Sequence, residues 1–296
     1  MVSMNHDTTA SPRYLVIGAN GKTGRRVSAR LTAAGHAVRA VSRSTAPAFD
    51  WYDAATWSAA LAGMDRVYIT FQPDIAVPAA AGIIEAFGRA AAAHGVERLV
   101  LLSGRGEPEA EACERVLFAS GVDTAVVRCS FFAQNFSEDF LAGPVHDGVI
   151  ALPAGDVREP VLDAEDIAEV AVKALTEDGR TGHVFELTGP RLMTFGDMAA
   201  DLGAATGREI VYLQVTPEEY AAGAVEAGMS ADDAEMLAGL FTNIFDGRNA
   251  SLTDGVADVL GRPARDFADF AAAAAAAGAW PTASAETTTS NETTAA

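Results

Sequence analysis

The sequence is poor in basic residues and in cysteine. Lysine and arginine together account for 21 of the 296 residues, against 40 aspartates and glutamates, which gives a formal net charge of -19. Nucleic acids and anionic membranes bind clustered basic residues, so we expect neither as a partner. The two cysteines, Cys113 and Cys129, lie in the apolar segments "EACERVL" and "VVRCSFF". Buried thiols in a reducing compartment are therefore expected rather than a disulfide.

Long hydrophobic runs are also absent from the sequence. The longest apolar stretch, "FAAAAAAAGAW", is too short to span a bilayer, and the start "MVSMNHDTTASPR" lacks the basic end and apolar run of a signal peptide. We therefore expect a cytoplasmic protein. The composition is 49% hydrophobic, which is ample for a packed core in a chain of this length.

Short apolar runs alternate with stretches of helical period. The predicted strands are 14–18, 36–43, 65–71, 96–104, 123–132 and 182–190, and the predicted helices include 23–35, 56–63, 83–95, 112–121 and 164–175. Such alternation predicts an α/β fold with a Rossmann-type doubly wound parallel sheet. The helical stretch 217–246, rich in Ala, Met, Leu and Phe, predicts a smaller C-terminal substrate lobe over the carboxyl edge of the sheet.

Three glycines follow the first predicted strand and open the first helix. In "GANGKTG", Gly18 permits a sharp turn, Gly21 lets the backbone approach a pyrophosphate, and Gly24 lets the helix sit close to the strand. The spacing differs from the commonest dinucleotide fingerprint, G-x-G-x-x-G. A tight turn with a purely structural role is the alternative interpretation.

The end of the second predicted strand indicates which dinucleotide would bind. Many NAD-binding proteins carry an acidic residue there to hold the ribose hydroxyls, whereas this sequence has Arg43 in "AVSRS". A guanidinium can pair with a 2'-phosphate, so NADP(H) is favoured over NAD(H). The alternative is that Arg43 is a solvated cation at a strand end.

These features divide the chain into four predicted parts. A disordered tail covers 1–11, an NAD(P)-binding Rossmann domain covers 12–136, the remainder of the fold with the substrate lobe covers 137–277, and a second disordered tail covers 278–296.

The motifs between about residues 14 and 270 resemble the NmrA-like branch of the atypical short-chain dehydrogenases/reductases. The resemblance rests on "GANGKTG", "SRS", "ALAGMDRVY", "LVLLSG", "FFAQNF", "DAEDIAEVAVKAL" and "LTGPRLMTFGDMA". Within this branch, "GKTG" with "FDWYDAATW" is similar to the ergot-alkaloid reductases, and the type 2 quinone reductases are the next-nearest group.

The resemblance implies a set of site residues. The implied cofactor contacts are Gly18, Asn20, Gly21, Lys22, Thr23, Gly24, Arg43, Asp50 near the adenine, Phe71, Gln72 and Pro73 along the cofactor, and Ser103 near the nicotinamide. Phe132 and Asn135 would lie on the substrate side. Independently of the resemblance, Phe136, Phe241 and Phe245 are expected to supply walls of an apolar substrate pocket.

The sequence lacks the usual proton donor of short-chain dehydrogenases, a tyrosine with a lysine four residues later. Its two lysines, Lys22 and Lys173, stand at that spacing from none of the five tyrosines. Ser103 is the candidate catalytic residue that remains, as a hydrogen-bond donor near the nicotinamide; the alternative is an ordinary serine at a strand end. The five histidines show no ligand spacing, so no metal site is predicted.

Together these observations predict an NADP(H)-dependent reductase of a small, largely apolar acceptor in secondary metabolism. An iminium ion or a quinone or enone fits the missing Tyr/Lys pair, since a C=N cation accepts hydride without prior protonation and a quinone can take its proton from water. Hydride transfer is expected in a cleft between the sheet and the C-terminal lobe. The alternatives are a non-enzymatic, NADP-sensing regulator of the NmrA type and a redox-neutral isomerase.

Overall fold

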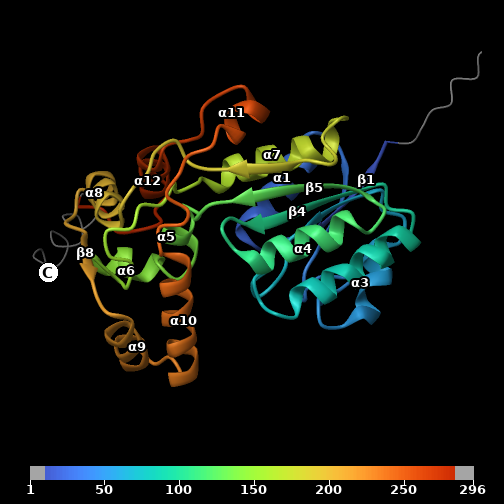
Figure 1. Cartoon of the computed structure of the whole chain (residues 1–296). Coiled ribbons are helices and arrows are strands. Elements are labelled where there is room, and N and C mark those ends of the chain that lie inside the picture. The colour runs from blue at the N-terminus through green and yellow to red at the C-terminus, as the bar shows by residue number, and fades with distance from the viewer. Residues whose placement is uncertain (1–10, 284–296) are drawn as a thin grey trace, which may run out of the picture. The chain divides into compact units, whose positions relative to one another are not determined.

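A computed structural model describes residues 11–283, and its main feature is a parallel sheet of six strands with flanking helices, shown in Figure 1. The strand order is β2-β1-β3-β4-β5-β7. These strands are β1 (Arg13–Ile17), β2 (Ala37–Val41), β3 (Arg66–Ile69), β4 (Arg98–Gly104), β5 (Asp123–Cys129) and β7 (Val184–Leu187). The predicted Rossmann-type α/β fold is confirmed.

The chain divides into two compact units. Unit 1 contains the residues up to Ser103 together with Pro108–Val127 and Ala171–Val184. Unit 2 contains Gly104–Glu107, Arg128–Val170 and the chain from Phe185 on. Unit 1 holds α1 (Lys22–Ala33), α2 (Trp57–Leu61), α3 (Ala80–Ala93) and α4 (Pro108–Phe118), with a short 3-10 helix at Ala54–Thr56.

In unit 1 the side chains of each strand point alternately to the two faces of the sheet, and both faces are covered by a hydrophobic core. All four residues from Tyr14 to Ile17 are buried, so both faces of β1 are covered. Leu15 and Ile17 on one face pack in a cluster with residues of α3 and α4, including Phe87 and Leu117. Figure 1 shows α3 and α4 side by side against the sheet.

Unit 2 is built mainly from helices. They are α5 (Asn135–Glu138), α6 (Ala142–Asp147), α8 (Phe195–Thr206), α9 (Pro217–Glu226), α10 (Ala231–Ile244), α11 (Gly255–Leu260) and α12 (Phe267–Ala276), while α7 (Ala164–Thr176) begins in unit 2 and ends in unit 1. A small parallel sheet pairs β6 (Val149–Leu152) with β8 (Val211–Gln214). Helices α9 and α10 pack against each other, as Figure 1 shows.

The helical stretch predicted over 217–246 consists of two helices, α9 and α10. A turn at Gly228, with φ of +100°, ends α9, and Ser230 caps α10 by accepting a hydrogen bond from the Asp233 backbone N–H. The prediction also missed β6 and β8, whose four-residue runs are too short to give a clear period.

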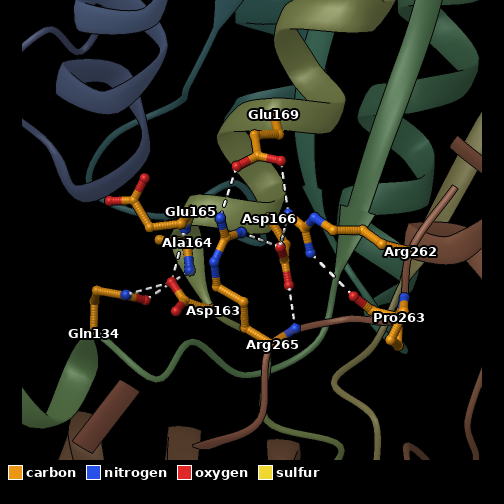
Figure 2. A network of polar contacts seen from close by, with 9 residues as sticks. All are labelled: Gln134, Asp163, Ala164, Glu165, Asp166, Glu169, Arg262, Pro263 and Arg265. Atoms are coloured by element: carbon orange, nitrogen blue, oxygen red, sulfur yellow. Dashed lines mark hydrogen bonds and ion pairs between the residues drawn. The ribbon is translucent and has the colours of Figure 1, made fainter. Parts of the chain in front are cut away.

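The start of α7 carries a network of ion pairs, shown in Figure 2. Asp163 caps the helix by accepting the Glu165 backbone N–H at 2.8 Å, and it also accepts from the Gln134 side chain at 2.7 Å. Asp166 is fully buried and pairs with Arg262 and Arg265. Charge pairing therefore fixes the segment before α12 to this helix.

The network continues to a second acid on α7. Arg262 and Arg265 also pair with Glu169, at 2.6 and 2.8 Å. These guanidinium groups hold the pKa of Glu169 below its usual value against the opposing effect of burial.

The last described residues are part of unit 2. Trp280, predicted to lie in the C-terminal tail, is buried and donates from Nε1 to the Phe136 carbonyl at 2.9 Å. Trp280 therefore packs with the fold. The predicted tail segments 1–10 and 284–296 lie outside the described residues. None of the helices within 11–283 has the length and apolar character required to cross a membrane.

Candidate functional site

The glycine turn connects β1 to α1 with two positions that only glycine fits. Gly18 has φ of +76°, and a Cβ there would stand 2.0 Å from Thr70 Oγ1. A Cβ on Gly24 would stand 2.2 Å from the Gly18 carbonyl oxygen, so this glycine allows the helix to approach the turn. The Gly18 and Ala19 backbone N–H groups both donate to the Val41 carbonyl, which ties the turn to the end of β2.

Gly21 has a different role from its two neighbours. It is the N-cap of α1 with an extended backbone, and its N–H donates to the Gly18 carbonyl at 2.9 Å. In the described chain α1 has neither a side-chain cap nor an acidic residue in its first turn. The start of this 12-residue helix therefore carries no negative charge of its own, and the positive end of the helix dipole is suited to an anion.

A pocket of about 460 Å³ lies beside this turn in unit 1. It is lined by Ile17, Gly18, Ser42, Arg43, Phe49, Asp50, Trp51, Tyr52, Thr70, Gln72 and Pro73. Of the predicted cofactor residues, these include Gly18, Arg43, Asp50, Gln72 and Pro73. Tyr52, 61% exposed, and Trp51 were not predicted, although the segment "FDWYDAATW" contains both.

Polar groups gather at one end of the pocket lining. Arg43 is exposed, and its side chain makes no hydrogen bond or ion pair within residues 11–283. The Asn20 side chain donates to Ser42 Oγ at 3.1 Å and to Ser44 Oγ at 3.4 Å. A cation beside several hydroxyl groups is an arrangement that suits a phosphate.

Two further predicted residues support the pocket structurally. Asp50 accepts the Tyr52 backbone N–H at its carboxylate and the Trp57 indole N–H at its carbonyl, at 2.9 and 2.8 Å. Phe71 is buried and its ring lies 5.1 Å from that of Trp51. Asp50 and Phe71 therefore hold in place the aromatic side of the pocket, which Trp51 and Tyr52 form.

The remaining residues predicted from the glycine turn lie on or beside α1. Lys22 and Thr23 are in its first turn, and Thr23 is buried. Neither residue lines the pocket.

Ser103 is the next-to-last residue of β4 and is 3% exposed. Its hydroxyl donates to Glu114 Oε1 on α4 at 2.6 Å, and Glu114 is buried as well. The serine proton is therefore held by a carboxylate within unit 1. Ser103 is not among the residues that line the pocket.

Three of the predicted substrate residues share one group of rings in unit 2, which we call the aromatic cluster. Its members are Phe131, Phe136, Phe140, Phe195, Tyr212, Tyr220, Phe241 and Phe245. Phe241 and Phe245 stack at 5.8 Å between ring centroids. Phe136 and Phe241 are fully buried, so they contribute to the core of unit 2. Phe140, 37% exposed, brings the cluster to the surface.

The other two predicted substrate residues lie just before α5 and at its first position. Phe132 forms a parallel β-bridge with Leu162. Asn135 begins α5 and is 8% exposed.

The sequence did not indicate Glu159, which is 1% exposed in unit 2. Burial raises the pKa of its carboxyl from the ordinary 4.5 to about 7, while Arg105 lowers and Asp246 raises this pKa. Its Oε1 has no hydrogen-bond partner among the residues that the structure describes. In the sequence, Glu159 is a single glutamate in "VREPVL", and nothing in this segment indicates that its carboxyl is buried.

Residues 18–178 match the model of a protein family described as NAD(P)H-binding. The matched region is more than half of the chain and contains the glycine turn and the pocket. The chain belongs to this NAD(P)H-binding family. It is an NAD(P)H-dependent oxidoreductase.

Similar proteins include enzymes with different acceptors. The chain is 32% identical over 274 residues to agroclavine dehydrogenase of Claviceps fusiformis, a match that covers 86% of this chain and 95% of that enzyme. Two solved structures share the fold at lower identity. Triphenylmethane reductase of Citrobacter sp. with NADP(H) has a TM-score of 0.77 and 19% identity over 89% of this chain and 99% of that one. NADPH-dependent quinone oxidoreductase of Escherichia coli with NADPH has a TM-score of 0.74 and 23% identity, over 88% and 98%.

The geometry of this NAD(P)H-binding oxidoreductase fits the cofactor that the family implies. A Cβ would fill the turn at Gly18 or Gly24, the start of α1 presents N–H groups, and the adjacent pocket offers aromatic side chains. Among the described residues no group of three or more His, Cys, Asp or Glu could hold a metal ion.

Proposed function

We propose that the protein is an NADP(H)-dependent reductase, with the adenosine half of the cofactor in the pocket of unit 1. The observation that carries the choice of NADP(H) is Arg43, an exposed cation on the pocket lining whose side chain has no partner in the described chain. A 2'-phosphate would supply the missing anion, and NAD(H) has none.

Other residues of unit 1 would position the rest of the cofactor. The N–H groups at the start of α1 would bind the pyrophosphate, next to the close approach at Gly18 and Gly24. Trp51 and Tyr52 offer aromatic surface to the adenine. Gln72 and Pro73 line the same pocket from the loop after β3. The bound cofactor would supply a hydride.

We propose that the acceptor is small and largely apolar, of the iminium or quinone type. The support is chemical: no tyrosine has a lysine four residues later, and Ser103 holds its proton against Glu114. An iminium ion needs no proton before hydride addition, and a quinone can be protonated by water. The name of the quinone oxidoreductase agrees with the second of these classes.

The test is NADPH oxidation, followed at 340 nm, with a panel of cyclic iminium ions, quinones and enones. Sustained turnover with one member of the panel and one product molecule per NADPH is the expected result. No oxidation with any acceptor, despite tight NADPH binding, would favour a sensor. Conversion of an acceptor without NADPH consumption would favour an isomerase. Either of these results would contradict the proposal.

A further inference from the structure

The pocket of unit 1 presents an aromatic ring to solvent at Tyr52. The lining includes three aromatic residues, Phe49, Trp51 and Tyr52. Phe49 and Trp51 are buried, whereas Tyr52 is 61% exposed. The Tyr52 hydroxyl makes no hydrogen bond within residues 11–283. A large ring that stands in solvent at a cavity is a surface that a planar ligand would cover.

The backbone of Tyr52 is held in place although its side chain is exposed. Its N–H donates to Asp50 Oδ1 at 2.9 Å, and Asp50 forms an antiparallel bridge with Asp53 on the other side of the tyrosine. Asp53 caps the following 3-10 helix by accepting the Ala55 N–H at 3.0 Å. The ring is therefore presented from a hydrogen-bonded turn, and a ligand would not have to order the chain in order to bind to it.

Tyr52 is the last of a series of aromatic rings that begins in the core. The ring of Phe87 on α3 lies 5.1 Å from that of Trp51, between centroids. Trp51 lies 5.1 Å from Phe71, and Phe71 lies 6.3 Å from Tyr52. The indole of Trp51 is fixed by its N–H, which donates to the Thr70 carbonyl at 2.9 Å. A planar base stacked on Tyr52 would extend this series by one ring.

The same pocket carries polar groups that suit a phosphate. Ser42 and Arg43 line it together with Tyr52. A ligand that covers the Tyr52 ring and also pairs with Arg43 must combine a planar ring with an anion. The adenosine 2'-phosphate half of NADP(H) has both features in one molecule.

We propose that Tyr52 binds the adenine ring of NADP(H) by stacking against it and determines the affinity for the base. This inference rests on the proposed NADP(H) site and separates the role of Tyr52 from that of Arg43. The base is common to NADPH and NADH, whereas the 2'-phosphate is present in NADPH alone. Tyr52 therefore sets the affinity for both cofactors, and Arg43 sets the preference between them.

Nitration with tetranitromethane tests the inference without any variant. The reagent modifies exposed tyrosines through their phenolate form. Tyr14 and Tyr68 are buried, and burial raises the pKa of Tyr212 and Tyr220, so Tyr52 should react fastest. Adenosine 2',5'-bisphosphate at ten times its dissociation constant should slow the nitration of Tyr52 about tenfold and leave the other tyrosines unchanged, as measured by peptide mass spectrometry. An equal rate with the bisphosphate bound, or no binding of the bisphosphate by calorimetry, would overturn the inference.

Calorimetric titration with NADPH and NADH gives the second test. The proteins are the natural one, Tyr52→Ala, Tyr52→Phe and Met236→Ala, which removes an exposed apolar side chain of α10 and serves as the control. Tyr52→Ala should weaken the binding of both cofactors about tenfold and leave their ratio unchanged. Tyr52→Phe keeps the ring and should stay within about twofold of the natural protein, as should Met236→Ala.

Two results with these variants would overturn the inference. One is a Tyr52→Ala protein that binds both cofactors as the natural protein does. The other is a loss confined to NADPH, because Tyr52 would then act on the 2'-phosphate instead of the base. The nitration test decides if Tyr52→Ala does not fold.

Failure of this inference is distinguishable from failure of the proposed function. If acceptors oxidise NADPH while its affinity is independent of Tyr52, the inference fails and the reductase function stands. If binding of adenosine 2',5'-bisphosphate depends on Tyr52 but no acceptor oxidises NADPH, the reductase function fails and the adenine site stands.

Discussion

Replacing Arg43 with alanine should remove the preference of this protein for NADPH over NADH. Arg43 lines the pocket, is exposed, and makes no side-chain hydrogen bond or ion pair in the described part of the chain. Its loss should therefore leave the fold intact. The substitution should weaken binding of NADPH, because its 2'-phosphate would lose a partner, and it should leave binding of NADH unchanged, because NADH lacks that phosphate.

The magnitude follows from the exposure of Arg43. Hydrogen bonds to charged groups contribute about 1.5–3 kcal/mol, and solvent screening at an exposed site places Arg43 near the lower end. A contribution of about 1.5 kcal/mol corresponds to about a tenfold preference for NADPH. Because the interaction is between exposed charges, the preference should shrink as salt rises.

Calorimetric titration with NADPH and NADH measures this preference at two ionic strengths. The control variant is Arg89→Ala, which removes an exposed arginine of α3 that pairs with Glu85. The Arg43→Ala protein should bind NADH as the natural protein does and NADPH about tenfold more weakly. Equal losses for the two cofactors would show that Arg43 acts on the fold, and a natural protein that prefers NADH would refute the assignment of NADP(H).

Four further variants test the structure, and one of them, Gly82→Ala, is a control. Gly24→Ala should destabilise the fold by at least about 2 kcal/mol, because its Cβ would stand 2.2 Å from the Gly18 carbonyl, whereas Gly82→Ala in α3 meets no atom within 4 Å and should stabilise by about 0.5–1 kcal/mol. Ser103→Ala removes the 2.6 Å bond to Glu114 and should cost about 1–3 kcal/mol in chemical denaturation. Glu159→Gln should change the pH dependence of stability. In the natural protein the folded carboxyl binds its proton more tightly than the unfolded one, so stability should fall by up to about 3 kcal/mol between pH 4.5 and 7 relative to the variant.

Each of these variants has a result that would contradict the structural reasoning. Equal melting temperatures for the Gly24 and Gly82 variants would mean that the turn and helix are not in close contact. A Ser103→Ala protein as stable as the natural one would mean that the hydroxyl does not bond to Glu114. Parallel pH profiles for the natural protein and Glu159→Gln would show that Glu159 ionises in the fold as it does in water.

Local features of the nucleotide-binding half were predictable from sequence. A run of apolar residues followed by three glycines specifies a strand, a turn and a helix, and the structure shows the close approach at Gly18 and Gly24. The position of Arg43 followed from the end of a strand. The contribution of Trp51 and Tyr52 was not predicted, because the pocket wall depends on where the loop after β2 folds back.

Features that depend on distant contacts were beyond sequence reasoning. Trp280 packs through its bond to Phe136, 144 residues earlier, and nothing in the local alanine-rich sequence indicates this contact. The hydroxyl of Ser103 donates a hydrogen bond to Glu114 on the next helix. The sequence alone did not indicate that this candidate donor already has an acceptor. Glu159 becomes unusual only because the fold buries it next to Met193.

The central claim, that this protein transfers hydride from NADPH to an organic acceptor, is tested most directly by isotope transfer. NADPH labelled with deuterium at C4 of the nicotinamide, in separate samples for each face, is mixed with the protein and the iminium or enone acceptor that turns over fastest. The product of such an acceptor keeps the transferred hydrogen on carbon, and it is analysed by mass spectrometry. We predict one deuterium per product molecule from one labelled face and none from the other. Product that forms without deuterium from either sample would contradict the claim.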